Sequence, residues 1–197
     1  MIPVANPIPE PAEFNEKCRK EGKKWFKKKP TSEKFPNHWR QFQPELAEGF
    51  KDRCGWWAMR IADGHVDHYQ SKSKKGNRNL VYEWSNYRYI AGTVNSSKRT
   101  LDDQILDPFE IQDGWFEVLL PSMQLVTTAA LPASLLAKAN LTMVKLHLDN
   151  GTKVRRVRKL WYKDYKDGKI TFAGLQDIAP LVAEAVAKRI SASQPLL

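Results

Sequence analysis

Residues 64–98 read GHVDHYQSKSKKGNRNLVYEWSNYRYIAGTVNSSK, and this stretch decides the expected fold. The Asp63-Gly64 pair predicts a tight turn between two short strands, because glycine adopts the positive φ that such turns require. A polar, glycine-bearing loop and a short helix are expected to follow. The expected order is a strand at 56–61, a strand at 65–70, a loop at 71–79, a partly helical aromatic segment at 80–90 and a helix at 92–99.

Four polar residues in this stretch have side chains suited to phosphodiester hydrolysis. Asp67 and Asn95 offer the carboxylate and amide oxygens that one hard divalent ion, Mg²⁺ or Mn²⁺, accepts as ligands. His68 is the candidate general base, because imidazole has a pKa near neutrality. Asn86 is expected to fix the loop that carries His68. An ideal strand points Asp67 and His68 to opposite faces, so the strand must end or twist at this point.

Lysine and arginine outnumber aspartate and glutamate by 32 to 22, which gives a formal net charge of +10. The excess concentrates within residues 17–29, 72–78 and 153–159. Such clusters attract a polyanion and release its counterions, so nucleic acid is the expected partner, although charge runs also occur on surfaces that bind nothing. The candidates for phosphate contact are Lys98 and Arg99, which follow Asn95 by one turn, and Lys72, Lys74 and Lys75 in the loop.

Three segments in order, VDHYQSKS at 66–73, YEWSNYR at 82–88 and NSSK at 95–98, resemble the HNH branch of the His-Me finger nucleases. The continuation LDPFEIQDGWFEV at 106–118 resembles small bacterial HNH proteins that are often encoded beside ATPases or reverse transcriptases in phage-defence cassettes. The resemblance covers about residues 54–128. It implies a ββα-metal core, cleavage of DNA with RNA not excluded, a role in antiviral defence and an ATPase or similar partner.

Many proteins of this kind carry two CxxC pairs that bind a structural zinc ion, and here the pattern departs from them. The corresponding positions are Cys54, Trp57, Ala91 and Val94, so three of the four ligands are replaced. A lone thiolate cannot hold tetrahedral Zn²⁺, and no structural zinc is expected. Apolar packing around Trp57 is expected to substitute for the metal. Cys18 and Cys54 are expected to be reduced thiols.

The flanking segments complete an expected α+β chain. Four prolines within residues 1–11 predict an extended arm. Apolar spacings of three and four predict the first two flanking helices, with Gly22 a candidate break in the first. A break is also expected near Asn140 in the helical segment at 132–148. These helices are expected at 12–29, 38–53, 132–148, 153–166 and 171–190, with a hairpin of strands at 115–120 and 125–128. The expected organisation is an arm with basic helices at 1–53, the HNH core with its hairpin at 54–128 and a helical region packing on the core at 129–197.

No apolar run is long enough for a membrane span and no export signal is visible, so a cytoplasmic protein is expected. Two interpretations stay open. The first is a metal-dependent HNH endonuclease, and the second is a catalytically silent, HNH-derived subunit that binds nucleic acid or assembles a complex. The aromatic residues of the stretch are expected to form core more than to stack on bases: Trp56, Trp57, Tyr82, Trp84, Tyr87 and Tyr89.

Overall fold

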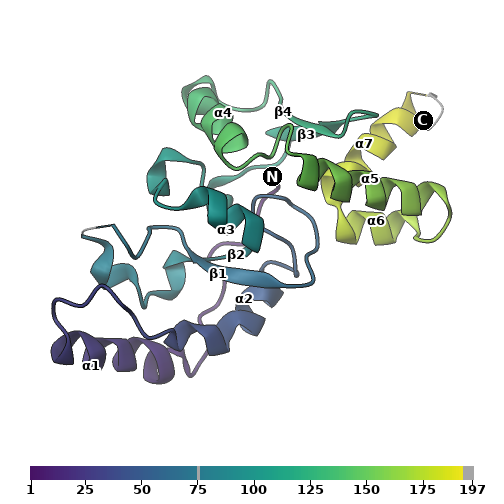
Figure 1. Ribbon diagram of the computed structural model, residues 1–197. Helices are drawn as coiled ribbons and strands as arrows, with labels where there is room; N and C mark the ends of the chain where they lie inside the picture. The colour runs from purple at the N-terminus through teal and green to yellow at the C-terminus, as the bar shows by residue number, and fades with distance from the viewer. Residues whose placement is uncertain (75, 193–197) are drawn as a thin grey trace.

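The computed structural model describes residues 1–74 and 76–192, and its architecture is α+β, as the sequence predicts (Figure 1). This part of the chain contains seven α-helices and two separate two-stranded antiparallel sheets. Within the same residues, no helix combines the length and the apolar character needed to cross a lipid bilayer.

One sheet pairs β1 (Gly64–His68) with β2 (Tyr87–Ala91), and α3 (Gly92–Lys98) begins directly after β2. Gly64 lies opposite Ala91, and His68 lies opposite Tyr87. Figure 1 shows α3 beside this sheet, so the three elements form one unit that carries the quoted stretch. The helix predicted at residues 92–99 is confirmed.

The hairpin predicted between residues 56–61 and 65–70 is wrong. The chain at Cys54 instead turns into a compact loop, in which the Cys54 N–H donates to the Met59 carbonyl and the Ala58 N–H donates to the Cys54 carbonyl. The φ angle of Gly64 is not positive, so this glycine does not serve the predicted tight turn. Its role is steric, because a Cβ at this position would lie 2.1 Å from Cζ of Tyr89. The partner of β1 is β2, and the long loop at residues 69–86 connects the two strands.

β2 was missed because its sequence, YRYIA, has no alternation of apolar and polar residues. All five of its residues are buried, as in a strand covered on both faces. Tyr87 and Tyr89 belong to one apolar core, whereas Ile90 belongs to the other, which follows from the two-residue period of a strand. β2 thus separates the two cores.

The first core joins the N-terminal helices to one face of β2. A π-helical stretch at Asn15–Lys20 continues into α1 (Glu21–Lys28), and a 3₁₀ turn at His38–Phe42 continues into α2 (Gln43–Gly49). Gly22 does not break the first helix; a Cβ there would lie 2.0 Å from Cδ2 of Tyr82, so glycine lets the Tyr82 ring pack. The second predicted helix ends earlier than expected, at Gly49.

The second core holds the C-terminal half against the other face of the unit. The predicted continuous helix at 171–190 is wrong, because Ala179 (φ −145°, ψ 68°) interrupts it before Pro180, which lacks an N–H. The expected break near Asn140 is absent. The elements are β3 (Phe116–Leu119), β4 (Gln124–Thr127), α4 (Leu136–Lys145), α5 (Thr152–Lys166), α6 (Phe172–Ile178) and α7 (Pro180–Ser191).

The two cores each cross a boundary of the predicted organisation. One contains residues from 1–53 and from 54–128, and the other contains residues from 54–128 and from 129–197. The division at residues 53 and 128 stays a prediction. Both cysteines are buried free thiols.

Candidate functional site

A cavity of about 170 Å³ lies at the C-terminal end of β1. Asp67 and His68 both line it, although they are neighbours on a strand. β1 ends at His68, which is where the alternating geometry of a strand stops applying. Asn95 enters the cavity from α3, so three of the predicted site residues come together there. We call this space the site cavity; it is lined by Val66, Asp67, His68, Ser71, Lys72, Ser73, Asn95 and Arg99.

The imidazole of His68 is held in one orientation. Its Nε2 lies 2.9 Å from the Val81 carbonyl oxygen, which can only accept, so Nε2 carries the proton in the neutral ring. Trp39 and Tyr87 pack edge-on against the imidazole at 4.6 and 5.1 Å between ring centroids. Nδ1 therefore keeps its lone pair, and no described residue hydrogen-bonds to it.

Burial lowers the pKa of His68 to about 3, and the nearby Lys72 ammonium acts in the same direction. The hydrogen bond with Val81 opposes these effects only in part. The ring is therefore neutral at physiological pH, which is the form that a general base needs.

Asn86 fixes the loop between β1 and β2 with three hydrogen bonds. Its Oδ1 accepts from the Gln70 N–H at 2.8 Å, and its Nδ2 lies 3.1 Å from the carbonyl oxygens of both Gln70 and Leu80. Val81, which follows Leu80, supplies the carbonyl that orients His68. Asn86 lines no part of the site cavity. Its contact with the Leu80 carbonyl, next to Val81, is the route by which it would orient His68, and this role stays a prediction.

Asp67 is buried beside Lys98. Lys98 Nζ lies 3.2 Å from Asp67 Oδ2 and donates to the carbonyl oxygens of His68 and Tyr69 at 2.9 and 3.0 Å. Asp67 Oδ2 still accepts no well-formed hydrogen bond within the described residues. Burial raises the pKa of Asp67, and Lys98 opposes this shift.

Lys98 was predicted to contact a phosphate, and the structure places it elsewhere. Its side chain is 0% exposed and its ammonium is engaged by two carbonyl oxygens and Asp67. It therefore joins α3 to the end of β1. The sequence pattern did not reveal this, since the partners are main-chain carbonyls distant along the chain.

The other basic candidates differ in their relation to the site cavity. Arg99, at φ 48° just after α3, is exposed and lines it, as does Lys72, whose ammonium lies 4.8 Å from the Trp39 ring centroid. Lys74 instead pairs with Asp102 at 3.4 Å, outside the cavity lining. Lys75 lies outside the described residues.

Trp39 is the residue near the site that sequence analysis missed. It contacts the His68 ring and lies under the Lys72 ammonium, yet it comes from the 3₁₀ turn before α2. The sequence contained only the amphipathic spacing of that segment, which indicates burial and says nothing of what the ring covers.

The residues present fit one hard divalent ion. The described residues contain no group of three or more His, Cys, Asp or Glu that could hold a metal. A Mg²⁺ ion needs fewer protein ligands, because it retains several waters. Asp67 and Asn95 both line the site cavity, and the Asn95 side chain hydrogen-bonds to no described residue. Asp67 Oδ2 is paired with the Lys98 ammonium at 3.2 Å, so Oδ1 is the Asp67 oxygen left for an ion. These two residues would hold the ion.

The four positions expected to replace the zinc site belong to the same apolar core. Cys54, Ala91 and Val94 are buried in one core, and Trp57 packs against it half-buried. The Trp57 N–H donates to Cys54 Sγ at 3.5 Å. Burial raises the pKa of Cys54, which disfavours the thiolate that zinc binds. We call these four residues the Cys54 corner.

No known protein-family model matches this chain, and no curated protein sequence matches it either. The chemistry of the site therefore rests on its own geometry and on the residues quoted from the sequence.

Proposed function

We propose that this chain is a metal-dependent endonuclease of the HNH type that hydrolyses phosphodiester bonds in DNA. One observation carries the proposal: a carboxylate, an oriented neutral imidazole and a free amide, Asp67, His68 and Asn95, line a single cavity at the end of β1. The succession β1, β2, α3 that presents them has the order of the ββα-metal core.

His68 would accept the proton of the attacking water at Nδ1. The Val81 carbonyl holds Nε2–H and so fixes the ring, which lines the cavity, with Nδ1 as the nitrogen that keeps its lone pair. A ring with such a low pKa is a weak base in the free protein. A phosphodiester bound beside it brings negative charge, which favours the protonated imidazole and strengthens the base as substrate binds.

Asp67 and Asn95 would bind the divalent ion through oxygen atoms. When bound, the ion supplies charge neutralisation on the phosphoryl group and stabilises the leaving alkoxide. Lys72 and Arg99 line the same cavity and are exposed, so their cationic groups are available to the non-bridging phosphate oxygens.

DNA is the proposed substrate class because the net charge is +10 and cations line the site cavity. Phosphate contacts of this kind carry no sequence information, so specificity would come from nucleic-acid structure or from a partner. A bacterial antiviral setting with an ATPase or similar partner belongs to the same proposal, through the resemblance of residues 106–118. The rival proposal is a catalytically silent subunit that binds nucleic acid or assembles a complex.

Plasmid nicking separates the two proposals. Purified protein is incubated with supercoiled plasmid and Mg²⁺ or Mn²⁺, beside His68→Ala and the matched His65→Ala. His65 is exposed on the same strand and does not line the site cavity. The endonuclease proposal expects metal-dependent nicking by the wild type and His65→Ala, with a loss of about 10²–10⁴-fold in His68→Ala. Binding without nicking in all three proteins would favour the silent subunit.

A further inference from the structure

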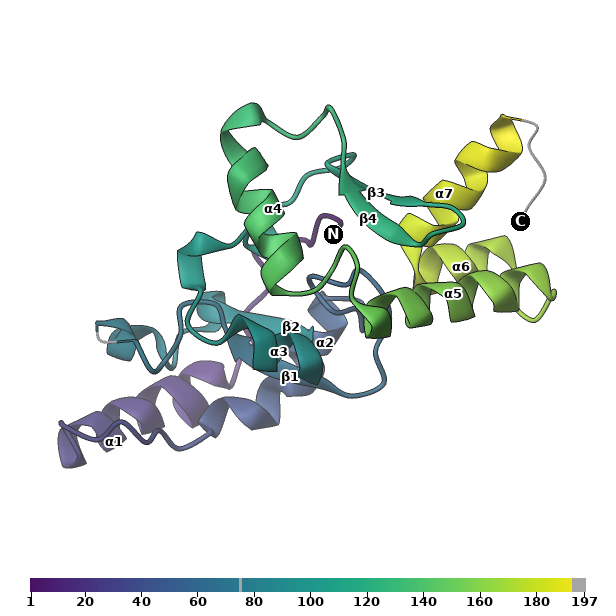
Figure 2. The same ribbon diagram turned by 45° about the horizontal axis from the view of Figure 1, so that its top comes forward.

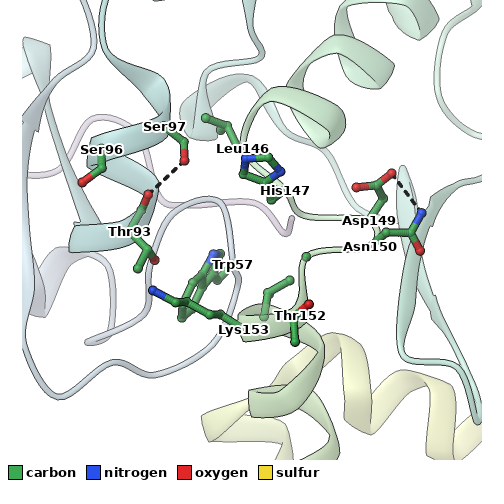
Figure 3. Close-up of a pocket in the computed structure, with 12 residues that line it drawn as sticks. Trp57, Thr93, Ser96, Ser97, Leu146, His147, Asp149, Asn150, Thr152 and Lys153 are labelled. Carbon is green, nitrogen blue, oxygen red and sulfur yellow. Dashed lines mark hydrogen bonds between the residues drawn. The ribbon is translucent and has the colours of Figure 1, made fainter.

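A second, larger cavity lies on the other side of α3 from Asn95. Its volume is about 640 Å³. Figure 3 shows its two walls. Thr93, Ser96 and Ser97 come from α3, and the opposite wall comes from the α4–α5 connection at residues 146–151 and from Thr152 and Lys153 at the start of α5, with Trp57 between the walls.

A third cavity has lining residues in common with both the large cavity and the site cavity. This intermediate cavity, of about 400 Å³, shares Arg99 with the site cavity and shares Ser96, Ser97 and His147 with the large one. α3 contributes residues to the lining of all three spaces, and Figure 2 shows this helix near the start of α5. We call them together the α3 groove.

The α3 wall of the groove permits close approach of a chain. Thr93, Ser96 and Ser97 are small, and the hydroxyls of the two serines donate to the carbonyls of Gly92 and Thr93 at 3.1 Å. A wall without charge or long side chains leaves room for a sugar–phosphate backbone.

Cations line each section of the groove. Lys72 and Arg99 stand at the site cavity, Lys145 at the intermediate cavity and Lys153 at the large one, and all four are exposed. The only acidic residue in the large cavity is Asp149, which is next to Asn150. Exposed cations in successive sections of the groove attract a polyanion and release its counterions.

Trp57 gives the groove an aromatic surface. Of the six aromatic residues considered for base stacking, five are buried in the cores, and Trp57 alone is half-buried and lines a cavity. An indole that is open to a cavity can stack on a base, which requires that the base be unpaired.

We propose that the α3 groove binds a single-stranded segment of the nucleic acid that the site cleaves, with one base stacked on Trp57 and a phosphate beside Lys153. The inference rests on the proposed function for the identity of the strand. The shape of the groove is maintained from beneath by Arg158, a buried side chain whose Nη1 donates to the carbonyls of Leu148 and Met123. These bonds tie the α4–α5 connection to the turn between β3 and β4.

Fluorescence anisotropy with a labelled single-stranded 20-mer, measured in EDTA so that nothing is cleaved, tests the groove. Trp57→Leu keeps apolar bulk and removes the aromatic face, and we expect it to weaken the Kd about tenfold. Trp57→Phe should restore most of the affinity. Lys153→Ala should weaken binding and lower the salt dependence by about one counterion, whereas Lys159→Ala should leave both unchanged. Lys159 is the matched control, because it is exposed on α5 and lines no part of the groove.

A fully paired duplex of the same sequence is the second arm, and its affinity should not change in Trp57→Leu. Unchanged affinity for the single strand in both Trp57→Leu and Lys153→Ala would contradict the proposal that the α3 groove binds it. If Trp57→Leu proves unfolded by its melting temperature, Lys153→Ala alone decides. Plasmid nicking distinguishes failure of this proposal from failure of the endonuclease proposal. If the wild type nicks plasmid and neither variant changes the affinity for the single strand, only the proposal for the groove is rejected. Weakened binding without nicking by the wild type rejects only the endonuclease.

Discussion

The site cavity and the Cys54 corner lie on the same β1–β2–α3 unit, but different forces hold them. The site cavity depends on directional hydrogen bonds from His68, Asn86 and Lys98 to main-chain groups. The Cys54 corner depends on apolar packing of Ala91 and Val94. Hydrogen bonds specify the orientation of a side chain, whereas apolar contacts tolerate exchange if volume is kept. Changes in the first region should therefore alter function most, and changes at the buried residues of the second, Cys54, Ala91 and Val94, should alter stability.

Asn86→Ala should have the largest effect on activity among positions outside the cavity lining. The change leaves the Gln70 N–H without its partner, removes one of the two hydrogen bonds to the Leu80 carbonyl and loosens the loop that carries Val81. We expect nicking to fall about 100-fold, as for misplaced catalytic groups, with about 1–3 kcal/mol of stability lost. Single-turnover nicking and urea denaturation measure the two effects. Asn79→Ala, at an exposed position of the same loop, is the control.

Val94→Ala should show the reverse behaviour. Val94 is 1% exposed in the core that forms the Cys54 corner, so the variant loses apolar contacts and leaves a small cavity. We expect about 1–3 kcal/mol of destabilisation with nearly normal nicking below the melting transition. A large loss of nicking activity in a fully folded Val94→Ala variant would show that the Cys54 corner and the site cavity are coupled. This result would contradict the separation of the two regions.

Acid should destabilise the site cavity through His68. Its pKa is lowered to about 3 in the folded protein, while the unfolded chain binds a proton below about pH 6.5. The contribution of neutral His68 is therefore present above pH 6.5 and is lost as the pH falls toward 3, at up to about 1.4 kcal/mol per pH unit. Urea denaturation between pH 7 and 4.5 should show a steeper loss in the wild type than in His68→Gln. Equal slopes would contradict the buried, neutral ring.

The smallest effect concerns metal content. Only Cys54 of the four positions in the corner is a zinc ligand type, and burial raises the pKa of its thiol. Elemental analysis of protein purified without chelator should find zinc well below one equivalent, and EDTA should not shift the melting temperature. Stoichiometric zinc would contradict the apolar account of this corner.

Sequence patterns predicted the parts of the unit that depend on local signals. The helix after residue 91 and the end of the strand at His68 follow from short-range periodicity and from the polar loop that begins at Ser71. β2 could not be recognised, because a strand buried on both faces lacks alternation and is paired by residues far along the chain. Pro180 was a visible signal for a helix start that the prediction of a continuous helix disregarded.

Within the site, residue types predicted Asp67, His68 and Asn95 as a group, and the structure brings them to one cavity. The placement of Lys98 and Trp39 could not be predicted. Lys98 bonds to main-chain carbonyls, which every residue carries, and Trp39 reaches His68 from a separate helical segment. Contacts of these kinds leave no pattern in the sequence near the site.

The central claim is that Asp67 and Asn95 serve one hydrolytic centre with His68, and a double-variant cycle tests it most directly. Mg²⁺-dependent nicking rates are measured for the wild type, Asp67→Asn, Asn95→Ala and the double variant. If both side chains hold the same ion, the account predicts that the double variant loses about as much activity as the worse single variant. Losses that multiply, or single variants that nick at the wild-type rate, would contradict it.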